Sequence, residues 1–133
     1  MVAAATPVPA LTLIGFGNWD LVTFNGHALI EGTSINLTFT DKFLTGKMSC
    51  NSYGGGRDSG AYLATEDGRL TVGTLAMTLR DCPEPAGIWD QEKAYVDAVS
   101  DAATYQILDD RLEISDSTGK VFLVFEKKLR LSS

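Results

Sequence analysis

The chain has 133 residues, of which 44% are hydrophobic and 21% are charged, and its formal net charge is −6 at pH 7. This length is typical of one domain that buries about two thirds of its unfolded surface and holds a core without a metal. The composition excludes general disorder. The acidic balance argues against a nucleic-acid or anionic-membrane surface, because either needs clustered Lys and Arg.

We expect three regions along the chain. The first ten residues contain two prolines and no basic residue, so they are not an intact signal peptide. We predict that residues 1–16 form a flexible linker, residues 17–128 the folded domain, and residues 129–133 a short tail. No run of about 20 apolar residues is present, so the sequence predicts no membrane-spanning helix.

Alternating apolar and polar residues predict β-strands along most of the domain. The pattern is clearest where Ile35, Leu37 and Phe39 fall on one face of a strand. Turn residues recur at intervals of about eight to twelve residues, which is typical of meandering antiparallel sheets. The predicted strands are residues 19–24, 34–40, 43–50, 61–65, 69–73, 74–78, 103–108, 111–115 and 120–126.

The apolar spacing changes to three and four between residues 88 and 100, which predicts the one helix of the domain. Pro83 and Pro85 precede it and favour a start there. A mainly β fold fits best: a small antiparallel β-barrel of about eight strands with one covering α-helix, because closure removes exposed strand edges. The residues predicted on the inner helix face are Ile88, Trp89, Glu92, Tyr95, Val96 and Val99.

Cys50 and Cys82 are predicted to form a structural disulfide, because each stands where a strand ends and their separation suits a hairpin that returns alongside its start. Such a bond closes a loop of about 30 residues and stabilises the fold by about 3–4 kcal/mol in the chain-entropy model. The alternative is a Cys50 thiolate activated by His27 as its base. No motif positions this single histidine, so the sequence favours the disulfide.

Several weak motifs follow one another over residues 17–126. The residues that carry them are Trp19, Cys50, Asn51, Tyr53, Thr78, Cys82, Glu92 and Tyr105. In this order they resemble the META domain, the family of the bacterial heat-shock protein HslJ. Ser49 departs from the family pattern, which usually has Gly before the first cysteine.

The resemblance implies a lipocalin-like outline with one helix, in an exported protein that is periplasmic, envelope-anchored as a lipoprotein, or secreted. It also leaves open a role in the stress response. The family carries no established catalytic residues, so none is transferred to this chain. One histidine and two distant cysteines do not supply a metal site either, and we expect no cofactor.

A glycine-rich loop is the candidate interaction site, because it presents two charged residues on a stem that has few conformational restraints. It lacks the ending of a phosphate-binding loop. The loop consists of Gly54, Gly55, Gly56, Arg57, Asp58, Ser59 and Gly60.

The sequence therefore predicts a non-enzymatic, monomeric, exported domain that binds another protein. A protease inhibitor is the more specific form of this hypothesis, with the glycine loop entering the active-site cleft of the protease. The alternative is a carrier of a small apolar ligand or lipid, in which Trp19 and Trp89 would line a cavity inside the barrel. The competing interpretation of these two tryptophans is that they fill the barrel ends.

Overall fold

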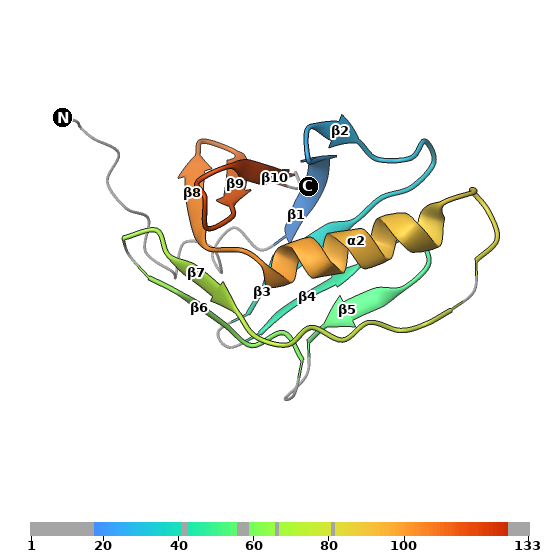
Figure 1. The fold of residues 1–133 in the computed structure, drawn as a ribbon, viewed down its shortest axis with the longest axis horizontal. Coiled ribbons are helices and arrows are strands. Elements are labelled where there is room, and N and C mark those ends of the chain that lie inside the picture. The colour runs from blue at the N-terminus through green and yellow to red at the C-terminus, as the bar shows by residue number, and fades with distance from the viewer. Residues whose placement is uncertain (1–17, 41–42, 56–58, 66, 81, 128–133) are drawn as a thin grey trace, which may run out of the picture.

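The computed structural model describes residues 18–40, 43–55, 59–65, 67–80 and 82–127. The linker and the tail predicted from the sequence lie outside these residues, so both stay predictions. In chain order the elements are β1 (Asn18–Phe24), β2 (His27–Ala28), β3 (Asn36–Phe39), β4 (Leu44–Lys47), β5 (Ser52–Gly54), β6 (Tyr62–Ala64), β7 (Leu70–Val72), α2 (Ile88–Ser100), β8 (Thr104–Leu108), β9 (Arg111–Ser115) and β10 (Val121–Lys127) (Figure 1).

The main sheet has eight antiparallel strands in the order β5-β4-β3-β1-β10-β9-β8, with β2 paired to β1. Strands β6 and β7 form a separate hairpin. Leu70 N of β7 donates a hydrogen bond of 2.9 Å to Ala103 O, in the residue just before β8. The mainly β architecture with antiparallel sheets and one helix is therefore confirmed. No closed barrel is found among the described strands, so that part of the expectation is not confirmed.

Strands β2 and β5 were not predicted from the sequence, and one predicted strand is not formed. Strand β5 lies between the predicted strand at residues 43–50 and the predicted glycine loop, and it includes the first glycine of that loop. Residues 74–78, predicted as a strand, run as an extended segment beside β5 and make only the single bridge between Tyr53 and Met77 (Figure 1). This segment then leads through Cys82 to the start of α2.

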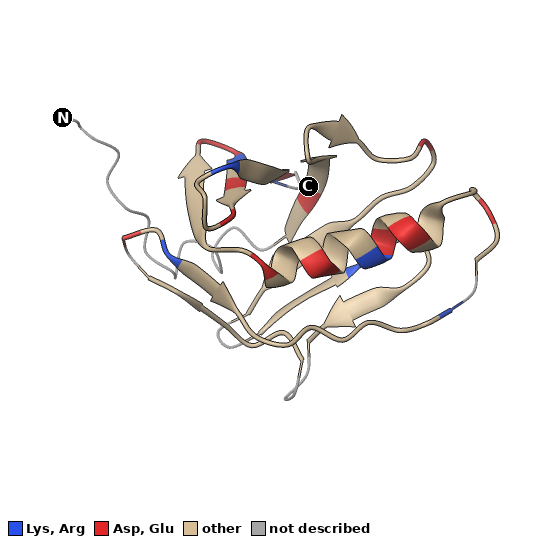
Figure 2. Cartoon of the chain, in the orientation of Figure 1, with Lys and Arg blue, Asp and Glu red and all other residues tan. Residues whose placement is uncertain are grey.

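Helix α2 matches the predicted range and packs against the sheet (Figure 1). Tyr95 of the helix makes edge-to-face ring contacts with Tyr53 and Phe125, and all three side chains are buried. Trp89 corrects the prediction for the inner face, because it is 45% exposed in the first turn. The opposite face carries exposed charged residues, including an ion pair of 3.0 Å between Lys93 and Asp97 (Figure 2).

Within the described residues, α2 is too short and too polar to cross a bilayer, and there is no other helix to consider.

Candidate functional site

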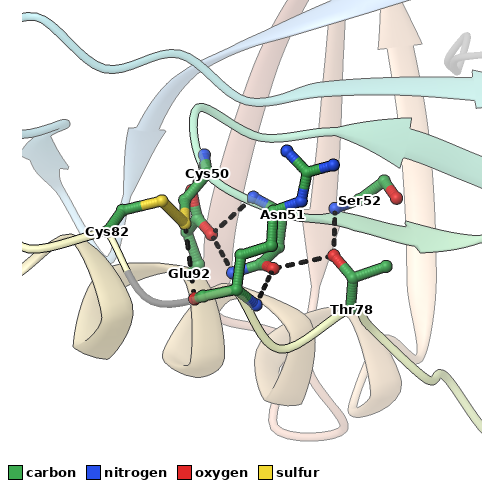
Figure 3. Close-up of a disulfide and its surroundings, with 7 residues drawn as sticks. Cys50, Asn51, Ser52, Thr78, Cys82 and Glu92 are labelled. Atoms are coloured by element: carbon green, nitrogen blue, oxygen red, sulfur yellow. Dashed lines mark hydrogen bonds between the residues drawn. A yellow bond between two sulfur atoms is a disulfide. The ribbon is translucent and has the colours of Figure 1, made fainter.

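The predicted disulfide is present between Cys50 and Cys82, whose Cα atoms lie 6.1 Å apart (Figure 3). It joins the turn between β4 and β5 to the segment that enters α2. Both cysteines of the chain are used in this bond. In this oxidised form Cys50 has no thiolate for His27 to activate, so the alternative of a cysteine nucleophile has no support.

The carboxylate of Glu92 lies fully buried beside this disulfide and accepts three hydrogen bonds (Figure 3). The backbone N–H of Cys50 donates to Oε2 at 2.8 Å. The backbone N–H and the Nδ2 of Asn51 both donate to Oε1 at 3.1 Å. Hydrogen bonds to an ionised acceptor are the strong ones, and a buried carboxylate needs them to offset its desolvation. Glu92 therefore fixes the turn between β4 and β5 onto the helix.

The side chain of Asn51 also binds the extended segment beside β5. Its Oδ1 accepts the hydroxyl of Thr78 at 2.7 Å and the backbone N–H of Arg80 at 2.7 Å. Its Nδ2 already donates to Glu92. One buried amide thus uses both its donor and its acceptor to join the helix, the β4–β5 turn and the extended segment.

Thr78 closes the network against β5. Its hydroxyl accepts the backbone N–H of Ser52 at 3.1 Å, and its own backbone N–H donates to Ser52 O at 3.0 Å. The predicted motif residues Asn51, Thr78 and Glu92 therefore lie together in one hydrogen-bonded cluster, which we call the Glu92 network.

Tyr53, another predicted motif residue, lies in β5 and belongs to a neighbouring pair of buried hydroxyl groups. Its OH donates to Asn36 O at 2.8 Å and lies 2.6 Å from the OH of Tyr95. Burial is the main cause that raises the pKa of Tyr53 well above that of an exposed tyrosine, and burial also raises the pKa of Tyr95. Sequence reasoning placed Tyr95 on the inner helix face but missed this pairing.

The structure places the remaining motif residues apart from this cluster. Trp19 is fully buried in β1, at the centre of the main sheet. Tyr105 is buried in β8 and its hydroxyl donates to Thr65 O at 2.7 Å. These two residues are core positions in separate parts of the sheet.

The described ends of the glycine loop are anchored to the sheet. Gly55 N donates to Leu44 O at 2.8 Å, and Gly60 O accepts from Leu44 N at 2.7 Å. A Cβ added to Gly60, whose φ is +94°, would lie 2.4 Å from Leu44 O, so no other residue fits this approach. The centre of the loop, Gly56, Arg57 and Asp58, lies outside the described residues, so its predicted role in interaction stays a prediction.

Leu79 is a further feature that sequence reasoning missed. It is 77% exposed, more than any other large hydrophobic residue described. The network holds the residues on both sides of it, since Thr78 bonds to Ser52 and the N–H of Arg80 bonds to Asn51. Exposure of this kind depends on tertiary contacts, so no signal in the single sequence could have identified it.

The chemistry available to the Glu92 network is limited. Its carboxylate, amide and hydroxyl groups hydrogen-bond one another and the backbone, and the carboxylate has no ion-pair partner in the described part of the chain. Nor does that part contain a group of three or more His, Cys, Asp or Glu residues able to hold a metal ion. The network therefore holds the backbone of Thr78 and Arg80 in place, and Leu79 is the exposed residue between them.

Three solved structures share this fold. A solution NMR structure is 18% identical with a TM-score of 0.65, over 90% of this chain and 95% of its own. An NMR structure of a protein from Burkholderia xenovorans is 25% identical with a TM-score of 0.63, over 96% of this chain and 94% of its own. A crystal structure of a DUF4847 family protein from Bacteroides vulgatus is 14% identical with a TM-score of 0.61, over 90% of this chain and 97% of its own.

Among proteins with curated descriptions, none matches this chain. The family model of the META domain matches residues 12–129, which is most of the sequence. It covers the disulfide, the Glu92 network and all the described strands. The chain therefore belongs to the META domain family, as the order of its motifs predicted.

Proposed function

We propose that this META domain is a non-enzymatic binding protein that recognises another protein through residues 77–80. The observation that carries the proposal is the 77% exposure of Leu79 on a backbone that the Glu92 network and the disulfide hold in place. Single exposed apolar side chains are common on protein surfaces, so the proposal depends on the restrained backbone around Leu79 as much as on its exposure.

Restraint of the backbone favours such a role. Binding normally loses free energy when a loop becomes ordered at an interface, by about 0.5–1.5 kcal/mol for each immobilised side chain. Here Thr78 and Arg80 are already fixed by Asn51, so less of this free energy is lost when a partner contacts Leu79. A few residues usually supply most of the affinity at an interface, and Leu79 is the residue that we propose for this role.

The proposed location is outside the cytoplasm. Disulfides form and persist in oxidising compartments, and the Cys50–Cys82 bond links the residues that support the exposed segment. We therefore propose that the domain acts as a monomer in the periplasm, at the envelope or in the medium.

The alternative of an apolar-ligand carrier has less support. The interior is occupied by large side chains such as Trp19, Tyr95 and Phe125, all fully buried. A surface pocket of about 430 Å³ is lined mainly by charged residues at the β8–β9 turn and the end of β10, including Asp110 and Arg111. An apolar ligand would need the opposite arrangement, an enclosed apolar cavity with few polar groups.

Site-specific photo-crosslinking tests the proposal. A photoreactive side chain at position 79 should capture one discrete protein from the exported fraction of the native organism, and excess wild-type domain should compete for this capture. The matched control carries the same group at Leu63, which is 65% exposed in β6. Equal capture from both positions, or capture that wild-type domain does not reduce, would show that residues 77–80 are not the recognition site.

A further inference from the structure

The backbone of the exposed segment leaves one edge open for pairing. Two hydrogen bonds to β5 flank Met77, one accepted by Ala76 O and one donated by Thr78 N. In an antiparallel pair with this pattern, the N–H and C=O groups of the central residue point away from the partner strand. Within the described residues these two groups of Met77 have no hydrogen-bond partner. An extended peptide backbone can therefore pair there.

The backbone N–H groups of Thr78 and Arg80 both bond on the β5 side, so alternation places the backbone groups of Leu79 on the outer side with those of Met77. The residue itself is 77% exposed. A free backbone edge with an exposed apolar side chain two residues later is the form in which a serine endopeptidase binds its substrate. The enzyme pairs with the extended backbone, and its S1 pocket takes the side chain before the scissile bond.

We infer that residues 77–80 are the reactive segment of a protease inhibitor, with Leu79 entering the S1 pocket and the Leu79–Arg80 peptide bond at the catalytic serine. The partner is a serine endopeptidase with an apolar S1 pocket. The inference rests on the proposed function and moves the inhibitory segment away from the glycine loop, where the sequence placed it.

The network explains why such a segment would inhibit rather than be digested. When the serine Oγ bonds to the carbonyl carbon of Leu79, the C–N bond to Arg80 breaks, and the serine proton passes through the catalytic histidine to the nitrogen of Arg80. That nitrogen lies 2.7 Å from Asn51 Oδ1 and is tethered to the fold through the nearby Cys82.

The new amine therefore stays beside the acyl-enzyme instead of diffusing away. Attack of this amine on the acyl carbon reverses each step, reforms the peptide bond and returns the proton to the serine. Held at high effective concentration, the amine competes with hydrolysis by water.

The test measures inhibition of chymotrypsin and subtilisin, which accept apolar side chains, by the oxidised full-length chain. Trypsin, whose S1 pocket carries an aspartate, serves as the specificity control. We expect competitive inhibition of the first two enzymes and none of trypsin. Leu79→Ala should weaken inhibition by about 30-fold or more, the size of a loss at an interface hot spot. The matched Leu63→Ala variant should inhibit within about twofold of wild type.

A second variant tests the assignment by gain of function. Leu79→Arg should transfer inhibition from chymotrypsin to trypsin, since only the side chain in S1 changes. Circular dichroism on the Leu79→Ala and Leu79→Arg variants checks that both are folded. Mass spectrometry should find most of the inhibitor intact, with any cut at Leu79–Arg80.

Complete digestion at this bond, or inhibition that Leu79→Ala leaves unchanged, would overturn the inference. So would the absence of inhibition of both enzymes at large molar excess. If a protein other than a protease is then captured specifically from position 79, the proposed function stands without this inference. If position 79 captures nothing specific, both are wrong.

Discussion

Glu92 Oε1 accepts two hydrogen bonds from Asn51, one from its backbone N–H and one from its side-chain Nδ2, both at 3.1 Å. This pair connects the helix to the β4–β5 turn through buried groups. Because Asn51 also holds Arg80, a buried side chain of the helix determines the geometry of a segment on the surface.

Glu92→Gln should destabilise the domain by about 2–3 kcal/mol. The amide keeps one acceptor oxygen but presents its NH₂ group to a backbone N–H, so a buried donor loses its partner. Urea unfolding measures the effect. The matched control is Asp97→Asn on the exposed face of the same helix, which should change the free energy of unfolding by no more than about 0.5 kcal/mol. Equal effects of the two substitutions would contradict the role of Glu92.

Thr78→Val should cost about 1–2 kcal/mol although the change conserves shape. It removes the hydroxyl that accepts from Ser52 N and donates to Asn51 Oδ1. Thr78→Ser retains the hydroxyl and should stay within about 0.5 kcal/mol of wild type. A Val variant as stable as the Ser variant would show that the hydroxyl makes no net contribution.

Reduction of the Cys50–Cys82 bond should lower the free energy of unfolding by about 3–4 kcal/mol, because the unfolded chain regains the freedom of a closed loop. Denaturation with and without reductant measures this difference. Alkylation of the untreated protein, followed by mass measurement, should detect no free thiol. Two alkylated cysteines in that sample would exclude the disulfide.

The buried tyrosine pair should make the domain less stable in alkaline solution. Burial raises the pKa of Tyr53 and of Tyr95, so both stay protonated in the folded state at a pH where exposed tyrosines ionise. Above a pH of about 10 the unfolded chain releases these protons and the folded chain does not, so the stability falls as the pH rises.

Each tyrosine whose pKa is raised in this way lowers the free energy of unfolding by about 1.4 kcal/mol more per pH unit in this range, which corresponds to one proton per tyrosine. Tyr53→Phe should therefore give a shallower slope above pH 10 than wild type, as measured by denaturation at a series of pH values. Identical slopes would show that the hydroxyl of Tyr53 does not titrate differently in the two states.

Local patterns in the sequence were sufficient for part of this structure. The helix was predicted over its full range because spacing by three and four is a local signal, and it ends as predicted at Ser100. Periodicity shows which face of a helix is apolar, but not which of its turns are covered by the rest of the protein. For this reason Trp89, in the first turn, was wrongly placed inside. The strand at residues 74–78 was overestimated for a related reason, since pairing with β5 depends on residues distant in sequence.

The site was predictable as a set of residues but not as a network. The resemblance identified Asn51, Thr78 and Glu92, yet their hydrogen bonds join positions 27 to 41 residues apart. Alternation would place Leu79 on the same face as Met77, which packs against the core. The pairing with β5 ends at Thr78, however, and the bond from Arg80 to Asn51 leaves Leu79 in solvent.

Amide hydrogen exchange at Arg80 tests the central claim that a buried network holds the exposed segment rigid. The N–H of Arg80 belongs to an exposed residue but donates to Asn51 Oδ1 at 2.7 Å. We predict that NMR will show exchange at least about 100-fold slower than in an unstructured peptide, equivalent to an opening free energy of about 2.7 kcal/mol. The protection should decrease in Thr78→Val. Exchange of Arg80 at the rate of an unstructured peptide in the oxidised wild-type protein would contradict the account.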